Sequence, residues 1–113
     1  MSERERRIGL NEALFRAVNE QIEELNRRMP DPNVGREHME VVCECGDSSC
    51  VERFRLPVSE YERARKDARR FLIVPGHEVP EVETVLETHE HYALIEKIHP
   101  EPEAIAEETD PRS

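Results

Sequence analysis

The sequence contains no tryptophan, two tyrosines and three phenylalanines, and only four glycines among its 113 residues. Few glycines leave no glycine-rich loop to cradle a phosphate, and neither a P-loop nor a G-x-G-x-x-G motif occurs. The G-x-S-x-G motif of serine hydrolases is also absent, and few aromatic rings are available to stack on nucleic-acid bases. These absences argue against nucleotide-dependent and hydrolytic enzymes.

Long apolar runs are missing as well. No segment approaches the ~20 consecutive apolar residues that a membrane-spanning helix needs. The first ten residues, MSERERRIGL, are charged and do not resemble a secretory signal. We therefore expect a cytoplasmic protein without a membrane partner. The three cysteines cannot all pair with one another, and a reducing compartment disfavours disulfides.

Acidic residues dominate the charge. There are 26 Asp and Glu against 16 Lys and Arg, a net charge of −10, and charged residues make up 37% of the chain against 36% hydrophobic residues. That balance allows one modest core and hence one small domain. Eleven acidic and two basic residues in 76–113 give that region a net charge of −9. Such a chain repels nucleic acid at long range, so we expect no nucleic-acid partner unless a local basic patch outweighs the rest.

The N-terminal third predicts a helix over residues 8–29, ended by Pro30 and Pro32. Its seam positions are spaced alternately by three and four residues, which is typical of a helix facing another helix. The stripe has two interpretations: it packs on its own domain, or it pairs with a second copy to give a homodimer through residues 8–29. The seam positions are Ile8, Asn11, Phe15, Val18, Ile22, Leu25 and Met29.

The remaining pattern predicts an α+β fold, in which a long N-terminal helix precedes a small antiparallel or mixed sheet with one or two short helices. We expect one domain over residues 1–98, with a Cys/His sheet module over 38–98. Residues 99–113 are acidic and proline-rich, which predicts a disordered tail. The expected elements are strands at 38–42, 51–56, 71–74 and 92–98, a helix at about 59–68, and a helix or strand at 80–87.

The cysteines are the clearest chemical feature. Cys43, Cys45 and Cys50 lie within eight residues, and the intervening Gly-Asp-Ser-Ser segment forms turns readily. A turn there brings three sulfurs close together, and thiolates are preferred ligands of a tetrahedral zinc ion. The spacing therefore predicts a zinc site that staples the fold, with an iron–sulfur cluster as the alternative cofactor.

A histidine is the best fourth ligand, because the chain has no fourth cysteine. His77 follows a predicted buried strand in the turn Pro-Gly-His-Glu, from which it can reach the cysteine turn. His38, five residues before Cys43, is the alternative. The predicted metal ligands are Cys43, Cys45, Cys50 and His77.

Neither redox nor catalytic chemistry fits this cluster well. Glu44, Asp47 and Glu52 surround the cysteines and disfavour a free thiolate, whereas a bound dication would stabilise it. Glu44 or Glu78 could serve as an acid or base, but the zinc-deaminase pattern is absent. We expect a structural metal and no enzymatic activity.

The sequence resembles a family of short uncharacterised actinobacterial proteins. The resemblance covers roughly residues 10–98 and is carried by Asn-Glu-Ala-Leu-Phe at 11–15, C-x-C-G at 43–46 followed by Cys50, and R-F-L-I-V-P-G-H-E at 70–78. It implies that Cys43, Cys45, Cys50 and His77 belong to one site.

The expected function is that of a small non-enzymatic zinc-binding protein acting as an interaction or regulatory adaptor for a protein partner. A second hypothesis is a nucleic-acid-binding regulator that uses the basic patch Arg63–Arg70, which holds five basic residues. A third is a thiol or metal redox sensor in which the cysteine cluster itself switches.

Overall fold

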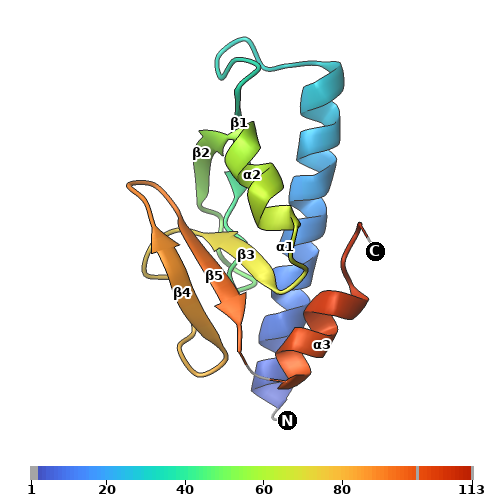
Figure 1. The fold of residues 1–113 in the computed structure, drawn as a ribbon, viewed down its shortest axis with the longest axis vertical. Coiled ribbons are helices and arrows are strands. Elements are labelled where there is room, and N and C mark those ends of the chain that lie inside the picture. Colours follow the sequence, from blue (N-terminus) through green and yellow to red (C-terminus); the bar gives the residue numbers. More distant parts are fainter. Residues whose placement is uncertain (1–2, 99, 113) are drawn as a thin grey trace.

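The structure, a computed structural model, describes residues 3–98 and 100–112. It has the expected α+β architecture, with a long N-terminal helix alongside small antiparallel sheets and short helices (Figure 1). None of the described helices is both long and apolar enough to cross a membrane. The elements are α1 (Glu3–Arg28), β1 (His38–Val42), β2 (Arg53–Pro57), α2 (Val58–Arg65), β3 (Arg70–Ile73), β4 (Glu83–Thr88), β5 (Ala93–Lys97) and α3 (Pro100–Glu108).

The strands form two antiparallel sheets. β1 and β2 make a hairpin in which Val41 lies opposite Phe54, and the cysteine segment connects the two strands. The second sheet has the order β3-β5-β4, with Phe71 of β3 opposite Ile95 of β5. The segment 80–87, for which helix and strand were both open, contributes β4, whose pairing with β5 is interrupted between Val85 and Glu87.

The core lies where the two sheets and α2 meet. Alternate residues of the hairpin point inward, as the period of a strand requires: Met39 and Val41 from β1 and Phe54 from β2 are buried. The ring of Phe54 stacks on that of Tyr92, with centroids 5.8 Å apart, and this contact joins the hairpin to the second sheet. β3 and β5 are buried along most of their length.

α1 turns a polar face toward the rest of the molecule. Glu12, Arg16, Asn19 and Glu23 are buried on that face. The guanidinium group of Arg16 donates to the carbonyl oxygens of Ala68 and Ala106, so its charge is solvated by backbone dipoles. The apolar stripe predicted from the sequence is divided between two sides of α1. Ile8 is buried against Gly46 and Ile22 packs against the core, whereas Val18, Leu25 and Met29 are exposed.

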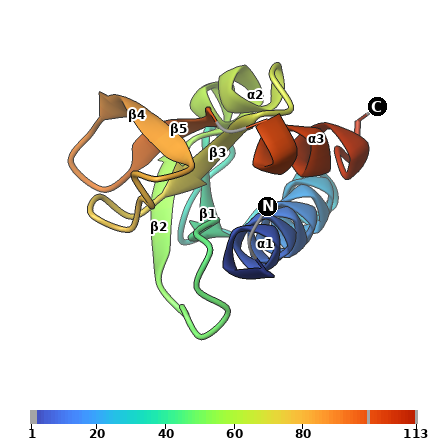
Figure 2. The same cartoon turned by 90° about the horizontal axis from the view of Figure 1, so that it is seen from below.

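The prediction of a disordered C-terminal tail is wrong for the part of the chain described, since residues 100–108 form α3. α3 packs against α1 (Figure 2). Gly9 of α1 faces Ile105 of α3, and an added Cβ there would lie 3.4 Å from the Ile105 side chain. Beyond the helix, Arg112 forms ion pairs with Glu20, Glu23 and Glu62. These long-range polar contacts hold a segment whose composition alone predicted disorder. Residues 99 and 113 of the predicted tail lie outside the described residues.

Candidate metal centre

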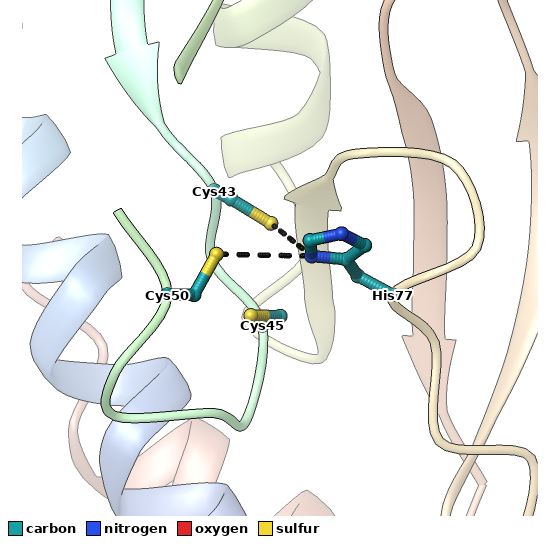
Figure 3. Close-up of side chains that lie close together, drawn as sticks. All are labelled: Cys43, Cys45, Cys50 and His77. Atoms are coloured by element: carbon teal, nitrogen blue, oxygen red, sulfur yellow. Dashed lines mark hydrogen bonds between the residues drawn. The ribbon is translucent and has the colours of Figure 1, made fainter. Parts of the chain in front are cut away.

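The four predicted ligands come together at one end of the hairpin. Cys43 and Cys45 follow β1, Cys50 precedes β2, and His77 follows β3, with the four side chains converging (Figure 3). Their ligand atoms all lie within 4.8 Å of one another. Cys43 and Cys45 are buried, whereas Cys50 and His77 are half-buried. His38 is not part of this group; it lies exposed on β1.

Two of the spacings among the ligand atoms match those around a single tetrahedral ion. Zinc binds sulfur at about 2.3 Å and nitrogen at about 2.0–2.1 Å, so a tetrahedral angle places a sulfur and a nitrogen ligand about 3.6 Å apart. In the structure, Nδ1 of His77 lies 3.6 Å from Sγ of Cys43 and 3.7 Å from Sγ of Cys50. A cluster of several irons would spread its ligands farther apart, because they would bind different metal atoms.

Local hydrogen bonds shape the cysteine loop. The backbone N–H of Cys43 donates to the carbonyl of Glu52, which extends the hairpin pairing beyond β1 and β2. Asp47 then organises the turn: its carboxylate accepts from the backbone N–H of Ser49 at 2.9 Å, and its carbonyl accepts from that of Cys50 at 3.0 Å. This turn returns Cys50 to the side of the loop where Cys43 lies.

The cysteine loop rests directly on α1. A Cβ at Gly46 would lie 2.5 Å from Cγ2 of Ile8, so only glycine fits this approach. The Asn11 side chain donates to the carbonyl of Gly46 at 3.0 Å. Asn19 donates to the carbonyl of Val42 and accepts from its N–H, both at 2.9 Å. Asn11, placed in an apolar seam by the sequence pattern, instead anchors the loop to the helix.

A second turn positions His77. Its backbone N–H donates to the carbonyl of Val74 at 3.0 Å, and Gly76 between them has φ +94°, a left-handed conformation that favours glycine. The N–H of Val74 in turn donates to Sγ of Cys43 at 3.2 Å. Such a bond stabilises a thiolate, and it ties the histidine turn to the cysteine loop.

Glu52 fixes which nitrogen of His77 faces the sulfurs. Its carboxylate lies 2.7 Å from Nε2 of the ring, so Nε2 carries the proton and donates it, leaving the lone pair of Nδ1 directed at the cysteines. Metal-binding histidines are commonly held in this way by a carboxylate. From the sequence, Glu52 could be recognised only as an acid near the cysteines. Its position two residues after Cys50 was the available signal, since alternate residues of an extended segment share one side.

Glu44 makes buried contacts that connect several elements of the fold. Its fully buried carboxylate forms an ion pair with Arg65 at 2.8 Å and accepts from the side chain of Asn19 at 2.7 Å. It also accepts from the backbone N–H of Leu72 at 2.9 Å. Glu44 therefore links the cysteine loop to α1, α2 and β3, and its oxygens are committed to these partners. No pattern in the sequence indicated this role.

The thiols influence one another. The thiol of Cys43 hydrogen-bonds to the sulfur of Cys45, which lowers the pKa of Cys45 to about 5. The same hydrogen bond, together with burial, raises the pKa of Cys43. One thiolate is thus favoured at neutral pH, and a bound dication would deprotonate the remaining ligands.

The basic patch Arg63–Arg70 is largely neutralised by acidic partners. Arg63 pairs with Glu60 at 2.7 Å and with Glu87 at 2.6 Å, and Arg65 is buried against Glu44. Arg69 and Arg70 both pair with Asp67 and Glu96. Four of the five cations therefore have acidic neighbours, which argues against a surface for nucleic acid.

Comparison of the chain with protein-family models, with curated proteins and with solved structures finds no match. The resemblance carried by the C-x-C-G and P-G-H-E segments thus stays a prediction, and the functional argument rests on the geometry of the site.

Replacing Glu52 with alanine should weaken metal binding about 10- to 100-fold, because the imidazole loses the group that orients it. Glu78→Ala is the matched control: Glu78 accepts from the backbone N–H of Gly76 in the same turn as His77 but does not contact the ring nitrogens in the contacts described. Competition with a chromophoric chelator measures both affinities. Equal affinities for the two variants would exclude a role of Glu52 in orienting the ligand.

Proposed function

We propose that this chain is a small cytoplasmic, non-enzymatic zinc protein that acts as an interaction or regulatory adaptor. The observation that carries the proposal is the convergence of three sulfurs and one imidazole nitrogen within 4.8 Å, between a hairpin loop and the turn after β3. In this proposal the metal is a staple that holds the surface of the domain in shape.

A structural role for zinc is supported by the number of ligands. Structural zinc sites use four protein ligands, whereas catalytic sites keep one position for water or substrate. Here the chain itself supplies four ligands. The acid nearest in sequence to two of them, Glu44, is buried in its ion pair with Arg65. Zinc is favoured over an iron–sulfur cluster because the ligand spacing suits one ion.

An interaction role is supported by the outer surface of α1. Leu10, Leu14 and Leu25 are exposed along this helix, at 46%, 61% and 62%. Charged residues make up 37% of the chain and account for its solubility, to which exposed leucines add nothing. Grouped apolar residues on a surface commonly mark an interface. The cytoplasmic assignment fits the three cysteines, which are all free thiols.

Affinity capture from the source cell tests the adaptor function. The unmodified protein should retain a partner protein, a second copy of this chain included, that Leu14→Glu loses, since a buried charge at an interface disfavours binding. Leu86→Glu is the control, because Leu86 is an exposed leucine on β4 and not on α1. Capture of the same proteins by all three forms, or of nucleic acid in a salt-dependent manner, would contradict the proposal.

A further inference from the structure

The outward face of α1 is free of charge between Leu10 and Leu25, and Arg28, paired with Glu24 at 3.0 Å, lies at the C-terminal end of this face. Five charged residues occur between Leu10 and Leu25, namely Glu12, Arg16, Glu20, Glu23 and Glu24. At about 3.6 residues per turn they all fall outside the arc that carries the exposed apolar residues. Polar but uncharged Gln21 completes the arc. Removing water from such a surface costs little free energy, because no charged group is buried. A partner surface that is also uncharged is therefore favoured.

The spacing of the residues along this face is the same whether it is read from the N-terminal or the C-terminal end. The α1 stripe consists of Leu10, Leu14, Val18, Gln21, Leu25 and Met29, spaced by four, four, three, four and four residues. A twofold axis between Val18 and Gln21 therefore maps the α1 stripe onto itself in an antiparallel copy. Leu10 then lies opposite Met29 of the copy, and Leu14 opposite Leu25.

A hollow lies at one end of the α1 stripe. Ile22 and Leu25 of α1 line it, together with Met29, Val34 and Met39 of the segment that follows. Its polar lining residues are Asn26, Asp31 and Glu40. In the antiparallel arrangement, Leu10 of the second copy arrives at this end. An exposed leucine thus meets an apolar hollow at each end of the pair, as side-chain packing between helices requires.

The position of α1 leaves the α1 stripe accessible. The helix runs along the edge of the molecule, with the sheets and α3 on other sides of it (Figures 1 and 2). Its inward face is occupied by the cysteine loop and α3, through Ile8, Asn19 and Gly9. A second copy can therefore approach without displacing any described element.

We propose that the protein is a homodimer in which the α1 stripes of two copies pack antiparallel. This proposal rests on the proposed function, in that it assigns the occupant of the α1 surface. It replaces the seam expected from the sequence: Phe15 and Ile22 are half-buried against the protein's own core side, and Leu10 and Leu14 take their place in the interface.

Sedimentation with two complementary variants tests the arrangement. The zinc-loaded protein should be a dimer above ~10 μM, and Leu14→Glu or Leu25→Lys alone should weaken association at least tenfold. Mixing these two variants should restore a dimer, because position 14 of one chain faces position 25 of the other. Leu86→Glu should remain dimeric.

Different results would contradict the dimer, its antiparallel arrangement or the proposed function. A monomeric unmodified protein overturns the dimer. Recovery only on mixing Leu14→Glu with Leu14→Lys overturns the antiparallel arrangement, since equal positions meet in a parallel pair. Metal analysis and circular dichroism of each sample separate a lost interface from a lost fold, and a dimer without metal would overturn the proposed function while leaving the dimer intact.

Discussion

Replacement of Cys45 by serine is expected to abolish metal binding and to lower the free energy of unfolding by more than about 3 kcal/mol. Cys45 is 1% exposed and sits between Cys43 and Gly46 at the centre of the cysteine loop. The metal would join this loop to the turn at His77, so its binding free energy contributes directly to folding. Chemical denaturation measures the loss, with Ser48→Ala in the same loop as the control.

The Cys45→Ser substitution should also destabilise α1. The helix holds the cysteine loop through Ile8, Asn11 and Asn19, and its inward face is polar. Without a fixed loop, these contacts lose their partners and little apolar burial remains to hold the helix. Hydrogen exchange should therefore accelerate in α1 more than in β3 and β5. Exchange in α1 that is unchanged by Cys45→Ser would show that the helix is held independently of the metal.

Replacement of Lys97 by methionine is expected to lower the free energy of unfolding by about 3–5 kcal/mol, as for other broken buried ion pairs. The ammonium group of Lys97 lies between the carboxylates of Glu12 and Glu83, 2.5 Å from the latter, and all three side chains are fully buried. These residues join α1 to β4 and β5. Methionine keeps the volume but leaves two acids together without a cation.

Neutralising one of the two acids should restore part of the free energy of unfolding that Lys97→Met loses. The double variant Lys97→Met with Glu83→Gln removes one buried negative charge, and its free energy of unfolding should exceed that of Lys97→Met alone. A double variant no more stable than the single one would exclude uncompensated charge as the cause. Thermal or urea denaturation of the single and double variants provides the comparison.

The buried acids also determine whether stability rises or falls with pH. Burial raises the pKa of Glu12 well above its ordinary value of 4.5. Burial, reinforced by Glu62, raises the pKa of Glu23 to about 7. The folded protein therefore binds protons that the unfolded chain has released. The stability contributed by Glu23 is complete below about pH 4.5 and declines as the pH rises through about 7, and the contribution of Glu12 also declines with rising pH.

The hairpin and the clustering of Cys43, Cys45, Cys50 and His77 could be predicted because their signals are local. Alternating residues predicted β1 and β2, and the turn residues between Cys45 and Cys50 predicted that the sulfurs would meet. His77 was identifiable from its place after a buried strand. These features depend on neighbours in the sequence, where periodicity and turn chemistry act directly.

The packing of α1 could not be predicted, because its partners lie far along the chain. Glu12 meets Lys97, and Arg16 meets carbonyl oxygens of residues 68 and 106. A helical pattern assigns charged residues to water and apolar residues to the core, and here distant countercharges reverse that rule. The hydrogen bond from Arg16 to Ala106 also ties α1 to α3, whose composition predicted disorder.

Metal analysis of the purified protein tests the central claim most directly. Protein prepared without chelator should contain one zinc ion per chain, and native mass spectrometry should show the same ion bound to the folded species. The Cys45→Ser variant should contain none. Absence of metal from the unmodified protein, or iron together with inorganic sulfide, would contradict a single zinc ion held by Cys43, Cys45, Cys50 and His77.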